Sequence, residues 1–99
     1  MAAKTPVRLS ALARADLREI ARYTAERWSI DQETHYAGEI RDALVQLGDG
    51  SREGRPIEAC EGYWKLRVRS HFIVYRKADN GFDVVRVLHQ RMDVPRQLQ

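Results

Sequence analysis

The feature that most constrains this chain is a change in the spacing of its apolar residues after Gly62. Before that point apolar side chains recur every three or four residues, which is the spacing of one face of an α-helix. After it, Trp64, Leu66 and Val68 alternate with charged residues, which is the pattern of a strand with one buried face. The sequence therefore predicts an α+β fold in which helices come first and an antiparallel sheet follows.

Two helices are predicted in the first half of the chain. The first covers Ala11–Arg27, and Ser10 is placed to cap it by accepting a hydrogen bond from an unpaired backbone N–H. The second covers Asp31–Gly48 and begins at a capping box formed by Ser29 and Gln32. The apolar stripes are Ala13, Leu17, Ile20, Ala21, Thr24 and Trp28 in the first helix, and Tyr36, Ile40, Ala43, Leu44 and Leu47 in the second. Because the connection is so short, we expect an antiparallel helical hairpin.

Strands are predicted at both ends of the chain. A short N-terminal strand covers Val7–Leu9, and a three-stranded antiparallel meander runs from Tyr63 to His89. Its strands are centred on Trp64–Val68, Phe72–Tyr75 and Phe82–His89, with a turn or bulge at Ser70-His71 and a hairpin turn at Asn80-Gly81. Residues 48–62 are rich in glycine and are expected to form a loop. We expect one domain over residues 1–99, with the hairpin packed on one face of the meander.

The composition agrees with a globular chain. Of the 99 residues, 43% are hydrophobic and 31% are charged, which differs from both disordered and membrane-spanning proteins. No apolar run approaches the roughly 18 residues of a membrane helix. The start of the chain has no continuous apolar segment of the signal-peptide type, so the expected location is the cytoplasm and no membrane partner is expected.

The positive charge is concentrated in the second half of the chain. Residues 1–62 carry 9 Lys and Arg against 11 Asp and Glu, a net charge of −2, whereas residues 63–99 carry 8 against 3, a net charge of +5. Such a basic half can face nucleic acid or an acidic protein segment equally well. Its regular placement within predicted strands differs from the continuous Lys/Arg run of a disordered nucleic-acid-binding tail.

The residues that commonly bind metals or react covalently are isolated from one another. Cys60 has no second cysteine for a disulfide and no basic neighbour in sequence to activate its thiol. The histidines lack ligand spacing, so neither a metal nor a cofactor is predicted; they are His35, His71 and His89. His35 is expected in solvent and His71 at a turn or strand end. Trp28 and Trp64 fall on apolar faces and are interpreted as core residues rather than base-stacking platforms.

Short segments along nearly the whole chain occur in a specific order and spacing. They are Leu9-Ser10, Ala13, Asp16-Leu17, Ile20, Tyr23, Trp28, Tyr36, Ile40, Gly54-Arg55-Pro56, Val74-Tyr75-Arg76 and, above all, the run from Val85 to Asp93. In this order they resemble ParE-type toxins of the ParE/RelE superfamily. One departure is Ser29, where a glycine after the tryptophan is common, and it affects the geometry of the turn between the helices.

The resemblance implies the toxin of a type II toxin–antitoxin pair. Such a toxin is held inactive in a hetero-oligomer by a ParD-like antitoxin, whose C-terminal segment folds along the toxin surface. ParE-type toxins inhibit DNA gyrase, so gyrase is the implied target and protein–protein contact the implied mode of action. The antitoxin's N-terminal part binds operator DNA, so this chain is expected to meet DNA only indirectly.

An alternative comes from RelE-type relatives, which cut messenger RNA on the ribosome. That chemistry needs a base, an acid and cations that stabilise the charge on the phosphate. The candidates are Arg67, Arg69, Arg76, Arg86, His89 and Arg91. His89 near Arg91 places a titrating group beside a fixed cation, but Arg86 and His89 are three apart in a strand and are expected on opposite faces. No catalytic residue is therefore assigned, and a purely regulatory binding module is the third possibility.

Two sets of surface residues are expected to contact other proteins. The target-contact set lies where the last strand runs into a polar, partly flexible tail, and it comprises His89, Arg91, Met92, Asp93 and Arg96. The antitoxin-contact set lies on apolar surface that a small core leaves uncovered and on neighbouring strand residues, and it comprises Leu12, Leu17, Tyr23, Arg67, Arg69 and Tyr75. Because the tail has few apolar residues, deleting Val94–Gln99 is expected to leave the melting temperature nearly unchanged.

Overall fold

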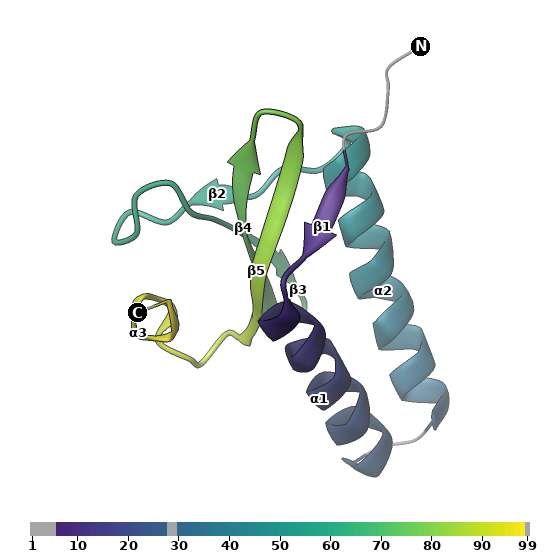
Figure 1. Ribbon diagram of the computed structural model, residues 1–99. Coiled ribbons are helices and arrows are strands. Elements are labelled where there is room, and N and C mark those ends of the chain that lie inside the picture. The colour runs from purple at the N-terminus through teal and green to yellow at the C-terminus, as the bar shows by residue number, and fades with distance from the viewer. Residues whose placement is uncertain (1–5, 28–29, 99) are drawn as a thin grey trace.

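The computed structural model describes residues 6–27 and 30–98 and has the predicted α+β architecture (Figure 1). In chain order the elements are β1 (Val7–Leu9), α1 (Ala11–Arg27), α2 (Ile30–Asp49), β2 (Arg55–Pro56), β3 (Trp64–Val68), β4 (His71–Ala78), β5 (Gly81–His89) and α3 (Val94–Gln97). The helices α1 and α2 lie side by side on one side of the sheet, and α3 lies on the other side. Within the described residues, no helix is both long and apolar enough to span a bilayer.

The sheet is larger than the predicted meander. It has five strands in the order β1-β5-β4-β3-β2, of which β3, β4 and β5 form the expected antiparallel core. The N-terminal strand β1 pairs in parallel with β5, and Phe82 N–H donates to the carbonyl of Pro6 over 2.8 Å. Arg55–Pro56 were expected in a loop, but they pair with β3 as a two-residue strand. So short a segment carries no periodicity of its own, which is why the sequence pattern missed it.

The predicted helices are confirmed with small shifts at their ends. Ser10 caps α1, because its Oγ accepts a hydrogen bond from the backbone N–H of Ala13 over 3.0 Å. The second helix runs one residue past Gly48 and is followed by Gly50, whose φ of +82° is the left-handed conformation that suits glycine after a helix. The predicted stripe residue Trp28 and the capping residue Ser29 lie outside the described residues.

The main core lies between the helical hairpin and the sheet. Both predicted helical stripes contribute to it, and it comprises Ala13, Tyr36, Ile40, Ala43, Leu47, Leu66, Val68, Ile73, Tyr75, Val84 and Val87. Trp64 packs against this cluster as predicted and stacks on Tyr75 with 6.4 Å between ring centroids. We call this side of the sheet the helix-covered face.

A second, smaller core lies on the opposite face. It is formed by Ile57, Val74, Leu88 and Val94, with Cys60, Tyr63, Phe72, Val85 and Leu98 packed around it. The prediction of a flexible tail without packing value is wrong here. Val94 is only 7% exposed, and Asp93 caps the short helix α3 by accepting a hydrogen bond from Arg96 N–H. Two apolar residues in a polar segment are too few to show a pattern, yet they suffice to hold the tail against the sheet.

Two irregularities determine where side chains point near the end of the sheet: a β-bulge in β5 and the turn between β3 and β4. Val74 pairs with Arg86 and Tyr75 pairs with Val84, so Val85 is the extra residue of a β-bulge. The bulge resets the alternation of β5, because Val84 and Val87 both belong to the helix-covered core although they are three residues apart. The turn between β3 and β4 consists of Arg69 and Ser70, one residue earlier than predicted, and Arg69 adopts a left-handed φ of +50°.

Candidate functional site

A cavity of about 600 Å³ opens where β5 ends beside the helical hairpin. Its walls come from both helices, from the start of β4, and from β5 and the segment after it. They are Asp16, Glu19, Ile20, Tyr23 and Thr24 from α1, Tyr36 from α2, Ser70 and His71 from the β3–β4 turn and β4, and Val87, His89, Gln90, Arg91 and Met92 from β5 onward. We call it the β5 cavity.

The polar part of the β5 cavity is a hydrogen-bonded pair from α2 and β4. The Tyr36 hydroxyl lies 2.6 Å from Nδ1 of His71 and donates to the carbonyl oxygen of Val68 over 3.1 Å. Because a phenol has one proton, the network is complete when Nδ1–H of neutral His71 donates to the phenol oxygen. This assignment leaves Nε2 of His71 as a hydrogen-bond acceptor.

His71 is held in its neutral form. Its pKa is lowered from 6.5 to about 4, mainly by burial and also by the nearby His89, while Asp16 partly opposes the shift. The two imidazole rings meet edge to face with their centroids 5.2 Å apart. His89 in turn accepts a hydrogen bond at Nδ1 from the backbone N–H of Arg91 over 3.1 Å. His71 therefore presents an uncharged, polar group at neutral pH rather than a cation.

Asp16 connects α1 to the edge of β5. Its carboxylate accepts hydrogen bonds from Nε of Arg86 over 2.8 Å and from the backbone N–H of Val87 over 2.9 Å. Both side chains are largely buried, and the carboxylate raises the pKa of Arg86. Since β1 pairs only with residues 82–84 of β5, the Asp16 carboxylate satisfies an edge N–H that β1 leaves open.

The rim of the β5 cavity exposes large apolar side chains. Tyr23 is 50% exposed and Met92 is 47% exposed, and both line the cavity. The guanidinium of Arg27 lies over the Tyr23 ring, 5.0 Å from its centroid. Exposed apolar groups beside a concave surface are typical of a protein-contact site.

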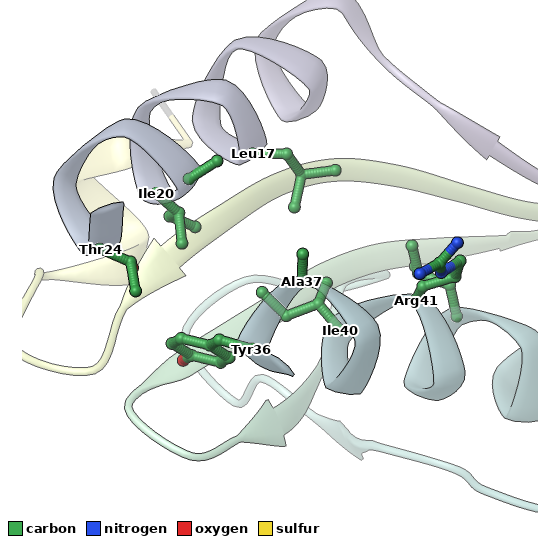
Figure 2. A pocket seen from close by; sticks show the side chains of 9 residues that line it. Leu17, Ile20, Thr24, Tyr36, Ala37, Ile40 and Arg41 are labelled. Atoms are coloured by element: carbon green, nitrogen blue, oxygen red, sulfur yellow. The ribbon is translucent and has the colours of Figure 1, made fainter. Parts of the chain in front are cut away.

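A second hollow is an apolar groove of about 150 Å³ between α1 and α2. Figure 2 shows Leu17, Ile20 and Thr24 of α1 facing Tyr36, Ala37 and Ile40 of α2 across it. We call it the hairpin groove. It shares Ile20, Thr24 and Tyr36 with the β5 cavity, so the two hollows adjoin.

The structure brings only part of the predicted target-contact set together. His89, Arg91 and Met92 line the β5 cavity, whereas Asp93 and Arg96 belong to the cap and body of α3. Arg96 is exposed. The segment after β5 thus has two roles, since its first residues form the cavity wall and its last residues pack against the sheet.

The predicted antitoxin-contact set is more scattered, and one member needs correction. Tyr75 is fully buried, and its hydroxyl accepts a hydrogen bond from Gly54 N–H over 3.0 Å, so its side chain is not on the surface. Sequence could not show that Tyr75 is covered, because the helical hairpin that packs over it is remote in the chain. Leu12 is 61% exposed at the start of α1, and Leu17 and Tyr23 line the two hollows.

The two arginines of that set lie away from the hollows. Arg69 donates to Glu39 of α2 over 2.8 Å, whereas Arg67 donates to the amide oxygen of Gln90 over 2.6 Å. Of the arginines weighed for phosphate chemistry, only Arg91 lines the β5 cavity; Arg86 is paired with Asp16 instead.

Sequence reasoning did not identify three residues of the cavity as site residues. Asp16 was noted only within a family motif, Tyr36 only within that motif and an apolar stripe, and His71 only as a turn or strand-end residue. The signal that could have identified two of them was a tyrosine and an aspartate at the edges of the apolar helical stripes, because buried polar groups need hydrogen-bond partners. Within the described residues, no cluster of three or more His, Cys, Asp or Glu side chains could hold a metal ion.

Comparison with known proteins identifies the family. Residues 7–94 match the sequence profile of the family described as "ParE toxin of type II toxin-antitoxin system, parDE". Toxin ParE1 of Mycobacterium tuberculosis is 45% identical over 92 residues, covering 91% of this chain and 94% of that protein.

Two solved structures share the fold. One, described as "Chromosomal ParDE TA system from P. aeruginosa", has a TM-score of 0.76 and 17% identity, covering 87% of this chain and 96% of that one. The toxin–antitoxin complex RelBE2 from Mycobacterium tuberculosis has a TM-score of 0.64 and 19% identity, covering 90% of this chain and 94% of that one. The family match over most of the chain, the close relative and the shared fold together show that this chain belongs to the ParE toxin family of type II toxin–antitoxin systems.

Proposed function

We propose that this toxin inhibits DNA gyrase in the cytoplasm by protein–protein contact through the β5 cavity, and that a ParD-like antitoxin neutralises it. The observation that carries the proposal is the composition of the cavity rim, where exposed Tyr23 and Met92 adjoin His89 and Arg91. Aromatic side chains, methionine and arginine are enriched in the buried centres of protein interfaces. The proposed target itself comes from the ParE family relationship.

The charges of the cavity favour contact with a protein over cleavage of RNA. The carboxylates on its walls, Asp16 and Glu19, are ion-paired with Arg86 and Arg22, and Arg91 is the one arginine that lines the cavity. Among the described residues that line the cavity, a scissile phosphate would meet only one cation that is not ion-paired, Arg91, and His71 is neutral. Phosphoryl-transfer sites instead gather several cations around the reacting group.

The hairpin groove is the proposed binding site for the antitoxin. Its lining is almost entirely apolar, and Figure 2 shows the side chains of both helices turned toward it. An amphipathic segment could place an apolar face in such a groove, against Leu17 and Ile20 of α1. Because the hairpin groove adjoins the β5 cavity, a segment bound there would cover the cavity rim at Tyr23. In this arrangement the antitoxin contacts operator DNA, and the toxin blocks gyrase only when released.

A ribosome-dependent endoribonuclease of the RelE type is the alternative. The observation in its favour is the pairing of His71 with His89 next to Arg91, since this is where a base and a cation come close. The RelBE2 complex shares the fold, but identity of 19% supports no transfer of activity.

One experiment separates the two functions. The purified toxin is added to a gyrase supercoiling reaction and to a reconstituted translation reaction in which mRNA cleavage is followed. We expect supercoiling to be inhibited and mRNA to remain intact. Met92→Gln should weaken inhibition about tenfold, because it removes an apolar contact at the rim. Val45→Gln is the matched control, since Val45 is 50% exposed on α2 but lines neither hollow.

The enzyme alternative makes a different prediction for His89. Under the proposal, His89→Ala weakens gyrase inhibition only partially, because no proton transfer is lost. The alternative replaces the proposal if the unmodified toxin cleaves mRNA on the ribosome and leaves gyrase supercoiling unaffected. In that case His89→Ala should abolish the cleavage.

Binding of the antitoxin is tested separately with two helix variants. Ala37 is exposed and lines the hairpin groove, whereas Ala15 is exposed on α1 and does not. Ala37→Arg should weaken binding of the ParD-like antitoxin at least about tenfold by filling the groove, and Ala15→Arg should leave it within about twofold. Equal loss in both variants, measured by titration calorimetry, would place the antitoxin elsewhere.

A further inference from the structure

The face of the sheet opposite α1 and α2 carries basic side chains from three adjacent strands. Lys65 and Arg67 alternate with the buried residues of β3 and therefore point away from the helix-covered face. Arg76 of β4 shares a face with Val74, which belongs to the second core. Arg55 of β2 pairs directly with Lys65, and directly opposed residues of an antiparallel pair lie on the same face. We call these four residues the sheet-face cations.

Among the described residues, no carboxylate forms an ion pair with a sheet-face cation. The strands β2, β3 and β4 contain no Asp or Glu. The ion pairs found among the described residues involve other cations: Arg8, Arg22, His35, Arg69, Lys77 and Arg86. Arg67 is hydrogen-bonded, but its acceptors are the neutral carbonyl of Arg69 and the amide oxygen of Gln90. Its charge therefore remains available to a partner.

The pairing of Arg55 with Lys65 reduces the stability of the fold. Two like charges directly opposite each other in an antiparallel pair repel, whereas an opposite pair would stabilise the sheet. Arg55 lies on the two-residue edge strand β2 and Lys65 on the neighbouring strand β3, and a carboxylate at either position would be compatible with the pairing. A surface with a purely structural role has no reason to keep this arrangement, but a surface that receives an anion does.

Aromatic rings hold two of these cations over the sheet. The ammonium of Lys65 lies 4.8 Å from the centroid of the Phe72 ring, and the guanidinium of Arg76 lies 5.2 Å from that of Tyr63. Such contacts orient a cation without cancelling its charge. Each cation lies over one face of its ring, so on that face Phe72 and Tyr63 present a cation to a ligand in place of an open stacking surface.

We propose that the sheet-face cations bind the phosphate backbone of a nucleic acid without reading its sequence. Lys65 and Arg67 are two residues apart on one strand, roughly 6.6 Å, and neighbouring strands are about 4.8 Å apart. A rigid array of unpaired cations at such spacing suits a ligand with a regular series of negative charges. An acidic protein segment fits less well, because its binding would call for apolar anchor pockets, and the aromatic rings here each have a cation over one face.

This inference goes beyond the proposed function, in which only the antitoxin contacts DNA. It is also independent of the β5 cavity, since none of the sheet-face cations lines it. A toxin that contacts a DNA-processing enzyme at one end and the phosphate backbone across its sheet would bind where protein and nucleic acid meet. DNA and RNA share the phosphate chemistry, so the experiment includes both.

The test is fluorescence anisotropy of the full-length toxin with labelled duplex DNA, single-stranded DNA and RNA of one length. Salt is varied from about 50 to about 200 mM, because the slope of log affinity against log salt counts phosphate contacts. We expect binding that weakens steeply with salt. In Lys65→Gln/Arg67→Gln the slope should fall by about two, roughly one for each lost cation.

A matched control removes the same charge from elsewhere. Arg14 and Arg18 are exposed on α1, and Arg14→Gln/Arg18→Gln should change the affinity by less than about twofold at 100 mM salt. Equal loss of affinity in this control would overturn the proposal, because binding would then follow net charge alone. So would full competition by a polyglutamate peptide at equal charge concentration, or no binding of any nucleic acid at the lowest salt.

Arg55→Gln separates a binding role from a structural role, because the two roles predict opposite changes in the melting temperature. Relief of the repulsion with Lys65 should raise the melting temperature by about 1 to 5 °C. The same substitution should lower nucleic-acid affinity and reduce the salt slope by about one. A lower melting temperature would show that Arg55 stabilises the fold and would contradict the argument. Tighter binding of one nucleic acid identifies the physiological source, and similar binding of all three supports the shared phosphate chemistry.

Discussion

The two faces of the sheet differ in what covers them and in what they leave exposed. The helix-covered face is buried under two long amphipathic helices and opens only at the hairpin groove and the β5 cavity. The opposite face is covered in part by the loop that contains Ile57 and by the four-residue helix α3, and it leaves the sheet-face cations in solvent. Where two long helices cover the sheet, the hollows that remain are apolar and suit protein partners. Where the sheet is only partly covered, strand residues can carry charge.

The two faces also differ in how far the residues that stabilise the fold are separated from the residues proposed to bind partners. On the helix-covered face most inward residues are below 5% exposure, and function is confined to the borders. On the opposite face a small apolar centre adjoins a charged surface, so a substitution can affect packing and binding together. Four changes would break or sharpen this comparison.

The largest effect is expected on the helix-covered face. Leu47 of α2 is 1% exposed, and Leu47→Ala should cost about 2–5 kcal/mol because it leaves a cavity between α2 and the sheet. Chemical denaturation followed by circular dichroism measures the loss. A cost under about 1 kcal/mol would mean that the hairpin adapts to the missing side chain and that this face is less rigid than its burial implies.

The opposite face should lose somewhat less when its cover is removed. Deleting residues 94–99 removes the buried Val94 and the packed Leu98, which should cost about 2 kcal/mol and lower Tm by roughly 10 °C. This expectation reverses the one drawn from sequence. Gln97→Ala is the control, because Gln97 is exposed on α3 and should leave Tm within about 1 °C. An unchanged Tm in the truncated chain would show that α3 contributes nothing to this face.

The border between the helices and β5 should respond to pH. The pKa of His71 is lowered from 6.5 to about 4 by burial, so the unfolded chain binds the proton more readily between these values. Stability due to neutral His71 is therefore complete above about pH 6.5 and is lost as pH falls toward 4. Because the ring is partly exposed, we expect a loss of about 1–2 kcal/mol, less than the full shift would give.

A variant isolates His71 from the groups around it. His71→Gln should flatten the stability profile between about pH 6.5 and 5. Asp16 faces His71 from α1, and Glu39 has its pKa lowered by Arg69, so carboxylates contribute mainly at lower pH. A slope that persists in His71→Gln would assign the titration to another group.

The smallest effect concerns the start of α3. Asp93 accepts a hydrogen bond from Arg96 N–H over 3.4 Å, so Asp93→Ala should cost about 0.5–1 kcal/mol. Asp93→Asn keeps an acceptor and should be nearly neutral. Thermal unfolding of both variants checks this, and an equal loss in the two would indicate that the charge of Asp93, rather than its capping bond, matters.

Much of the helix-covered core could be predicted from sequence. Tyr36, Ile40 and Leu47 are recognisable from helical spacing alone, and Leu66 and Val68 from alternation. These patterns work because each regular element presents one face to its surroundings, whatever that face packs against. The rest of the core could not be found this way. Val94 and Leu98 lie in a segment with no period, and their burial depends on packing against the apolar side chains of Val74 and Leu88 from the strands β4 and β5.

The candidate sites were predictable only in pieces. His89, Arg91 and Met92 were singled out from sequence and do line one cavity, but Asp93 and Arg96 belong to α3 and Tyr75 is buried. The uneven charge of the chain was visible from the start, but the alignment of Arg55 with Lys65 was not. That alignment depends on the pairing of a two-residue strand, which no local sequence pattern predicts.

By itself, the sequence determined the order of helices and strands, the buried side of each regular element and the resemblance to ParE toxins, because all three are properties of residues close together in the chain. Tertiary structure alone decided which distant residues meet. Asp16, Tyr36, His71 and His89 come from four different elements and form one cavity only because β5 pairs with both β1 and β4 beneath the helices. Strand pairing and packing depend on the fit of whole surfaces, and that fit cannot be predicted from any single stretch of the sequence.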